Sequence, residues 1–414
     1  MSTATSNANV VAAPEPLPGA KPGAGSAVRM ASIDAFRGLV LALMMGEAGR
    51  FCGIAAARPA SALWAFLCHH QEHVPWVGCS LHDLIQPGFS FLVGAALPYS
   101  LASRAMRGQG RGAMIAHAFR RALILVLLGV FLRSLGHPQT YWTFEDTLTQ
   151  IGLGYGFLFI LGLRPRREQW IAMAVILLAF WVAFALYPVP GLGFDWQSAG
   201  VPAGWSQQMS GFEAHWNKGA NLSEDFDRWF LNLFPRERPF LYNEGSWATL
   251  SFVPTLATMI LGLLAGGVLR SERTSATKLR WLLAAGVSFL AAGGLVHVLG
   301  LCPIIKRIWT PSFTLWSGGW CFLFLAFFYW ALDMRGPRRW AFPLLVLGTN
   351  SIAAYVMNWV FVGPTEAALV RHFGRGPFDV LGADFEATLV GASALLVTWL
   401  VLLWMQKRKI FIRI

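Results

Sequence analysis

Residues 247–269, WATLSFVPTLATMILGLLAGGVL, decide the fold, because they run without a single Asp, Glu, Lys or Arg. A helix needs about 20 predominantly apolar residues to cross the hydrocarbon core of a bilayer. Across the 414-residue chain, hydrophobic residues make up 55% and charged residues only 13%, with 19 Trp and 31 Phe. A soluble domain of this size has too few polar residues to cover that much apolar surface. We therefore expect a polytopic membrane protein.

Similar apolar runs recur along the chain and predict an all-α membrane helix bundle of about ten spans. The predicted spans are 33–54, 82–103, 117–136, 146–163, 169–187, 247–269, 281–301, 313–333, 341–362 and 386–406. A transmembrane β-barrel would instead show short segments of alternating polarity. We expect residues 29–414 to form this membrane domain. Residues 1–28, rich in Ala, Pro, Gly and Ser, predict a disordered cytoplasmic tail.

The charge pattern predicts the orientation of the bundle. Lys and Arg exceed Asp and Glu to give a net charge of +12. They gather in alternate short loops, near 104–121, 164–167, 270–280 and 335–339, and again at 407–413. Under the positive-inside rule these loops and both termini are cytoplasmic, and the long loop of about 188–246 is periplasmic. The basic excess thus reflects topology, and we expect no nucleic-acid partner.

Ionisable residues inside apolar spans are costly and often mark a site. Asp34 and Arg37 lie three residues apart on one face of the first span. They either cap and pair at the cytoplasmic interface, or Arg37 receives a phosphate-bearing ligand. Glu47 lies deeper on the same helix, with no obvious partner nearby in the sequence.

A second polar cluster leads into the second span. Its members are His69, His70, Glu72, His73, Trp76, His82 and Asp83. Only the 69–73 histidine pair has a spacing suited to one metal on a helix, so we expect no metal site. A histidine can accept a proton near neutral pH and a carboxylate can fix its tautomer, so the cluster favours acid–base chemistry. Trp76 and the other outer tryptophans serve either as membrane anchors or as surfaces that stack on sugars.

Further polar positions lie on the outer face and in the ninth predicted span. Glu244 ends the long loop, and Lys306 lies in an outer loop against the positive-inside trend. Asn350 and Ser351 fall within the ninth span. Each has a structural alternative, a salt bridge for Lys306 and interhelical hydrogen bonds for Asn350 and Ser351. The five cysteines show no short paired spacing of the kind found in zinc or redox pairs.

Several of these segments resemble motifs of the heparan-α-glucosaminide N-acetyltransferase family and its bacterial relatives. Residues 29–38, RMASIDAFRG, resemble the family's R-x-x-S-x-D-x-F-R-G opening. Residues 73–87, HVPWVGCSLHDLIQP, resemble its H-x-x-W-x-G-x-x-x-x-D-L-x-x-P segment, whose histidine, His73 here, is the active-site residue. Residues 306–312 and 348–355 are similar to two further motifs, and the four occur in family order.

The resemblance implies a membrane acyltransferase that moves acetyl from cytoplasmic acetyl-CoA to an amine or hydroxyl of an amino sugar on the periplasmic side. His73 would act as general base or carry the acyl group, with Asp83 orienting it. Asp34 and Arg37 would bind the donor. Acceptor contacts would come from Glu47, Trp76, Glu244, Lys306, Asn350 and Ser351. The large luminal domain of the animal enzyme has no counterpart here, so the resemblance is to the bacterial form and implies the bacterial inner membrane.

The motifs also depart from the family pattern. Glu47, Ala48 and Gly49 occupy the region of a family asparagine, residues 148–151 lack an arginine, and Ile305 replaces another asparagine. These changes put heparan-type glucosamine in doubt as the acceptor. A sugar or anion transporter, with Asp34, Arg37, Glu47 and Asp83 along its path, is the main alternative, and a non-catalytic scaffold is another. The oligomeric state, a homodimer included, is left open.

Overall fold

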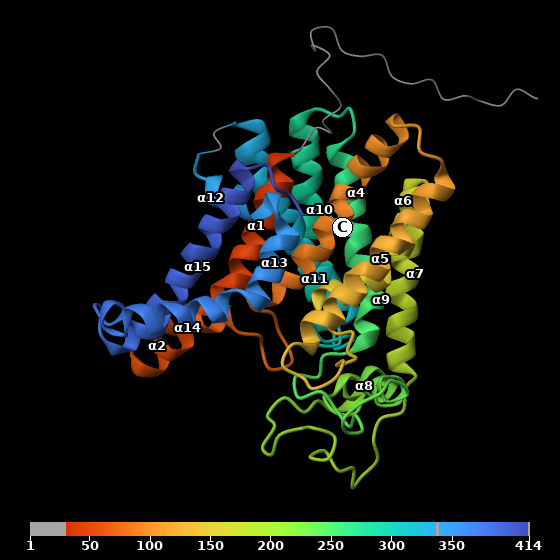
Figure 1. Ribbon diagram of the computed structural model, residues 1–414. Coiled ribbons are helices and arrows are strands. Elements are labelled where there is room, and N and C mark those ends of the chain that lie inside the picture. The colour runs from red at the N-terminus through yellow and green to blue at the C-terminus, as the bar shows by residue number, and fades with distance from the viewer. Residues whose placement is uncertain (1–29, 337–338, 413–414) are drawn as a thin grey trace, which may run out of the picture.

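The computed structural model describes residues 30–336 and 339–412, and there it is helical with no strand longer than an isolated bridge. Long helices pack side by side, and the loops around α8 (Leu222–Phe230) gather at one end of the bundle (Figure 1). This confirms the all-α membrane bundle expected from the apolar runs. The tail predicted for residues 1–28 lies outside the described residues.

Seven helices in the described ranges are long and apolar enough to cross a membrane, and α1 with α2, bent by 43°, would make an eighth span. Six of the seven long helices are α4 (Ile85–Met106), α5 (Arg111–Ser134), α7 (Arg166–Ala185), α9 (Phe252–Leu269), α10 (Ser275–Val298) and α15 (Ala383–Lys407). The seventh begins as α11 (Pro311–Phe328) and continues as a π-helical turn. The bent pair is α1 (Ala31–Met45) and α2 (Phe51–Ala57).

Two of the predicted spans differ from the observed helices, one in length and one in continuity. The run 146–163 becomes α6 (Thr147–Gly162), which is short for a bilayer. The run 341–362 is divided at Asn350 into α12 (Phe342–Thr349) and α13 (Ser351–Val360). The count of about ten spans therefore stays a prediction.

Helix α9 lies at the centre of the bundle, with 83% of its most apolar window buried. It packs against α4 through glycines on both helices, since a Cβ at Gly94 would lie 1.9 Å from the Met259 carbonyl oxygen. A Cβ at Gly262 would lie 1.8 Å from the Phe91 carbonyl oxygen. Small residues let two membrane helices approach closely, so these positions hold α4, and the polar loop before it, against the core.

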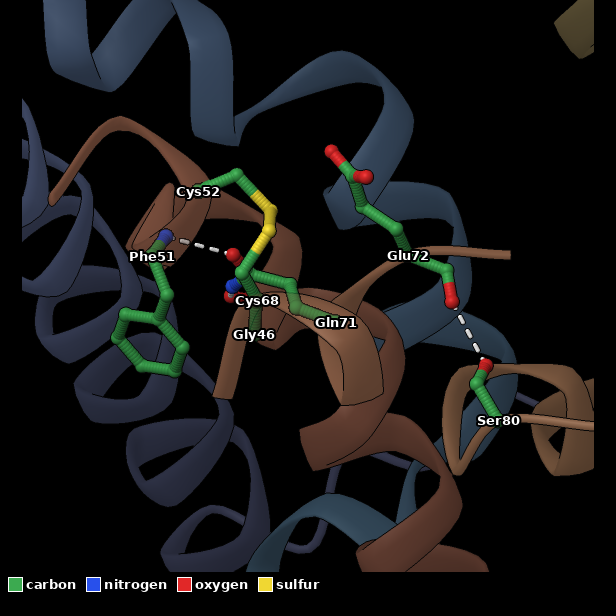
Figure 2. The surroundings of a disulfide bond; sticks show 7 residues. All are labelled: Gly46, Phe51, Cys52, Cys68, Gln71, Glu72 and Ser80. Atoms are coloured by element: carbon green, nitrogen blue, oxygen red, sulfur yellow. Dashed lines mark hydrogen bonds between the residues drawn. A yellow bond between two sulfur atoms is a disulfide. The ribbon is translucent and has the colours of Figure 1, made fainter. Parts of the chain in front are cut away.

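At the end of the bundle that the charge pattern predicts to face outward, here called the outer end, α2 and α3 (Ala62–Gln71) are joined by a disulfide between Cys52 and Cys68. The disulfide lies beside α14 (Val362–Phe373) (Figures 1 and 2). The cysteine spacing did not indicate this pair, because the two partners are 16 residues apart and meet only through the turn between the two helices. Disulfides persist in oxidising compartments, so the bond supports an outward position for this end of the bundle.

Candidate active site

Backbone N–H groups of the loop between α3 and α4 hold the carboxylate of Asp83 in place. The backbone N–H groups of Ser80 and Val74 donate to its Oδ2 at 2.8 and 3.3 Å. The Asp83 side chain is only 1% exposed. Two backbone donors on a buried carboxylate favour its ionised form, so Asp83 is a fixed acceptor in the site.

A backbone bridge between Val77 and Ile305 ties this loop to the outer loop that carries Lys306. Gly78 donates its N–H to the Ile304 carbonyl at 2.9 Å and takes a φ of +122°, a conformation that favours glycine. The bridge explains why Lys306, remote in sequence, arrives beside His73.

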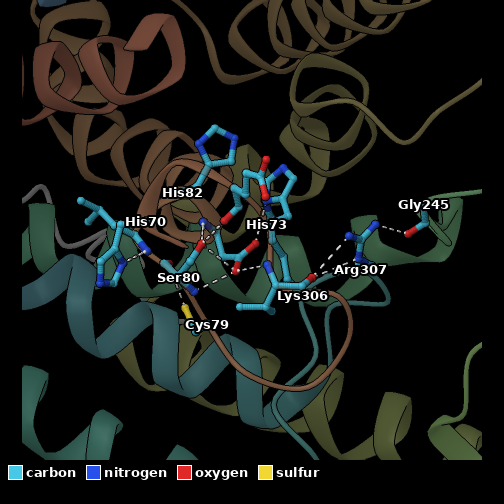
Figure 3. Close-up of polar contacts among 12 residues, drawn as sticks. His70, His73, Cys79, Ser80, His82, Gly245, Lys306 and Arg307 are labelled. Carbon is cyan, nitrogen blue, oxygen red and sulfur yellow. Dashed lines mark hydrogen bonds and ion pairs between the residues drawn. The ribbon is translucent and has the colours of Figure 1, made fainter. Parts of the chain in front are cut away.

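His73 and Asp83, ten residues apart, meet at 2.7 Å between Nδ1 and Oδ1. With Nδ1–H donating to the carboxylate, Nε2 of the neutral ring is left as a proton acceptor. The Lys306 Nζ lies 3.1 Å from Nδ1 and 3.7 Å from Asp83 Oδ1. Its ammonium group therefore lies beside the ring and shares the Asp83 carboxylate with it (Figure 3).

The surroundings shift the protonation of both basic groups. Burial, and then the charge of Lys306, lower the pKa of His73 to about 4, against the opposing effect of Asp83. Burial likewise lowers the pKa of Lys306 to about 8. At neutral pH the imidazole is therefore neutral and able to act as a base, while Lys306 remains mostly cationic.

Trp247 packs against His73 and Lys306. The sequence did not indicate it as a site residue. Its ring contacts the His73 ring at 4.9 Å between centroids, and Lys306 Nζ lies 4.9 Å from its centroid. Arg307 Cζ lies 4.8 Å above the same ring. A tryptophan at the start of an apolar span is usually an interfacial anchor, so its position in the sequence carried no signal for this role.

Two cavities approach the site from opposite ends of the bundle. The outer one, about 210 Å³, includes His73, Lys306 and Trp247 in its lining. The inner one, about 620 Å³, opens among the basic ends of α4 and α5. Both cavities are lined by Thr147 and Tyr355, so these two side chains form the wall at which the cavities meet.

The inner cavity is strongly basic. Its lining contains Arg37, Arg104, Arg107, Arg120, Arg121 and His117. No carboxylate is found among the described residues that line it. Arg37 donates to Asp34 at 3.0 Å, as the pairing alternative expected, and faces this cavity as well. Such a surface suits an anionic ligand with several phosphates.

Three of the predicted acceptor contacts line three different cavities. Glu47 lines the outer cavity, whereas Ser351 lines the inner one and is thus removed from an acceptor on the outer side. Glu244 lines a separate outer cavity near Tyr242.

Two of the expected acceptor contacts are corrected by the structure. Trp76 is fully buried and donates to the Trp216 carbonyl at 3.0 Å, so it packs beneath the outer loops. Asn350 bonds the backbone of Ile410 and Ile412 at 3.0 and 3.1 Å. It is also buried, so it ties down the C-terminal segment and does not face the outer cavity.

The clustered histidines do not converge on one point. His70 Nδ1 accepts the Leu81 N–H at 3.1 Å, while His73 is held by Asp83. Within the described residues, one group has metal-like spacing, that of Cys52, Cys68 and Glu72. The disulfide occupies both of its sulfurs.

The sequence is similar to two known acetyltransferases. Heparan-alpha-glucosaminide N-acetyltransferase of Homo sapiens is 23% identical over 371 residues, and that of Mus musculus is 23% identical over 368. Both alignments cover 80% of this chain. The chain is a distant relative of these acetyltransferases. It spans about half the length of each heparan-alpha-glucosaminide N-acetyltransferase, 53%. No protein-family model matches the chain.

Proposed function

We propose that this protein is a membrane acetyltransferase that takes acetyl from acetyl-CoA at the cytoplasmic face and passes it to an amino sugar at the periplasmic face. The observation that carries the proposal is the meeting of two cavities at Thr147 and Tyr355. One is basic and opens at the end that the charge pattern predicts to be cytoplasmic. The other contains His73 and Asp83 at their 2.7 Å contact.

On the donor side, the arginines of the inner cavity would bind the phosphates of acetyl-CoA. Guanidinium groups bind phosphate with two parallel hydrogen bonds, and those facing this cavity come from three helices, α1, α4 and α5. With the phosphates held there, the acetyl end would point toward Thr147 and Tyr355. This orientation delivers the reacting carbon to His73 without exposing it to lipid.

On the acceptor side, Nε2 of His73 would remove a proton from the attacking amine or hydroxyl. Asp83 holds the ring and stabilises the imidazolium as it forms. The Lys306 ammonium lines the same cavity as His73 and would offset negative charge that develops on the acetyl oxygen. In a second version of the mechanism, His73 first accepts the acetyl group itself.

The location that fits this function is the bacterial inner membrane, with both termini in the cytoplasm. The Cys52–Cys68 disulfide supports it, because α3, which carries Cys68, ends at Gln71, two residues before His73. A disulfide there is stable in the periplasm but not in the reducing cytosol.

The test is the release of CoA from acetyl-CoA by purified protein in detergent, with and without glucosamine. We expect glucosamine-dependent release in the wild type, its loss in His73→Ala, and unchanged release in His69→Ala, a matched change of an exposed histidine on α3. Acetyl-CoA binding by His73→Ala at wild-type affinity would show that the protein is folded. Glucosamine flux into proteoliposomes without CoA release would instead establish the transporter.

A further inference from the structure

A second histidine–carboxylate pair lies in the outer cavity. His82 Nε2 lies 2.9 Å from Glu47 Oε1, and both residues line the cavity that contains His73. The His82 side chain is 6% exposed, whereas that of Glu47 is 57% exposed. The pair therefore reaches from the buried interior of the cavity to its open side.

The two pairs are in direct contact. The His73 and His82 rings meet edge to face with 4.4 Å between centroids (Figure 3). The mechanism above uses only the first pair, so the second has no assigned role. Other titratable or charged groups that face the same cavity are His73, Lys306, Arg133, Glu145, Asp146 and Tyr355.

Acetylation of a protonated amine removes two protons from the nitrogen, and a single base accepts only one of them. At neutral pH a primary amine is mostly the ammonium ion, R–NH₃⁺, which has no lone pair with which to attack. It must lose one proton before the attack and a second as the amide forms. The second goes by way of His73 to the sulfur of CoA, so a separate acceptor is required for the first.

We infer that Glu47 and His82 are that acceptor, binding the acceptor's ammonium group and removing its first proton. The inference rests on the proposed function and deepens it. The Glu47 carboxylate takes the proton and releases it to the outer solvent. The neutral amine then forms the C–N bond to the acetyl carbon as the C–S bond breaks. The sum is R–NH₃⁺ plus acetyl-S-CoA, giving R–NH-acetyl, HS-CoA and H⁺.

The test measures kcat/KM for acetyl transfer to glucosamine from pH 6 to 9 in Glu47→Gln and His82→Asn. Without the pair, only the amine that is already neutral in solution can react. We expect each variant to fall at least about tenfold below wild type at pH 6. The deficit should shrink about tenfold per pH unit and nearly vanish above the pKa of the amine. The matched controls are Glu237→Gln and His137→Asn, a pair of outer residues whose side chains lie 3.9 Å apart outside this cavity.

Two results would overturn the inference. One is a loss of the same size at every pH, which a general disturbance of the site would cause, and the other is no loss at all. Glu47→Asp, which keeps a carboxylate, should recover the wild-type pH profile in part. Acetyl-CoA binding is measured for each variant to show that it is folded. If the wild type itself does not transfer acetyl to glucosamine, the proposed function fails, whereas parallel pH profiles in an active wild type reject only this inference.

Discussion

Replacing Lys306 by methionine removes the buried ammonium group beside His73 and keeps an apolar chain of similar length. The Lys306 side chain is 4% exposed, so a charged or shorter replacement would disturb the packing more. The His73 pKa is lowered from 6.5 to about 4, with burial the larger cause and Lys306 the next. We therefore expect the substitution to raise this pKa by about one pH unit, equivalent to ~1.4 kcal/mol.

The sign follows from the role of His73 as a base. It accepts a proton only when neutral, and it is neutral above its pKa, so the acid limb of kcat should move upward by about one pH unit. The wild type should also lose activity at alkaline pH, as Lys306, whose pKa is about 8, loses its charge. The variant should lack that alkaline limb, and its maximum should be lower by about 10²–10³, the usual loss when one stabilising donor is removed.

The assay is CoA release at saturating glucosamine between pH 3 and 9.5, a range that spans the wild-type acid limb near pH 4, with acetyl-CoA binding measured in parallel. Lys218→Met is the control, because Lys218 is also buried in the outer loops but does not line the His73 cavity. An acid limb at the same pH in Lys306→Met and wild type would refute the coupling between Lys306 and His73. An alkaline limb that persists in the variant would refute the assigned role of the ammonium charge.

Three further predictions concern the groups that position the site. Asp83→Asn should lower kcat by about 10²–10⁴ with little change in acetyl-CoA binding, because an amide cannot hold the same His73 tautomer. The rate of CoA release from acetyl-CoA measures this loss. Cys52→Ser should cost about 3 kcal/mol, as expected for a loop of 16 residues, and thermal unfolding in detergent should show the same loss in wild type treated with reductant. Gly94→Ala should destabilise the α4–α9 contact by about 1–3 kcal/mol, seen as a lower unfolding temperature, whereas Gly112→Ala, where a Cβ meets nothing, should not.

The sequence predicted the type of fold because membrane spans depend on composition over a local window. It also predicted that His73 and Asp83 share a site, through the motif that contains both. Their contact depends on a loop whose backbone N–H groups come from Val74 and Ser80, and no spacing rule gives that geometry.

Contacts between distant segments were the part that sequence could not supply. The Glu47–His82 pair joins residues of two predicted spans that lie 35 positions apart in the sequence, so no local spacing indicates it. Asn350 looked like a functional polar residue inside a span, but it satisfies the backbone near the C-terminal end at a break between two helices. The meeting of the two cavities at Thr147 and Tyr355 likewise depends on how α6 and α13 pack.

The most direct test of acetyl transfer across the membrane uses sealed proteoliposomes with acetyl-CoA on one side and glucosamine on the other. With the donor at the face that exposes the basic loops, N-acetylglucosamine should appear in the opposite compartment, and His73→Ala should abolish it. Transfer from one adjoining cavity to the other predicts no product when both compounds are confined to the donor side. Product formed there at the same rate would contradict an acetyl path from the inner cavity to His73.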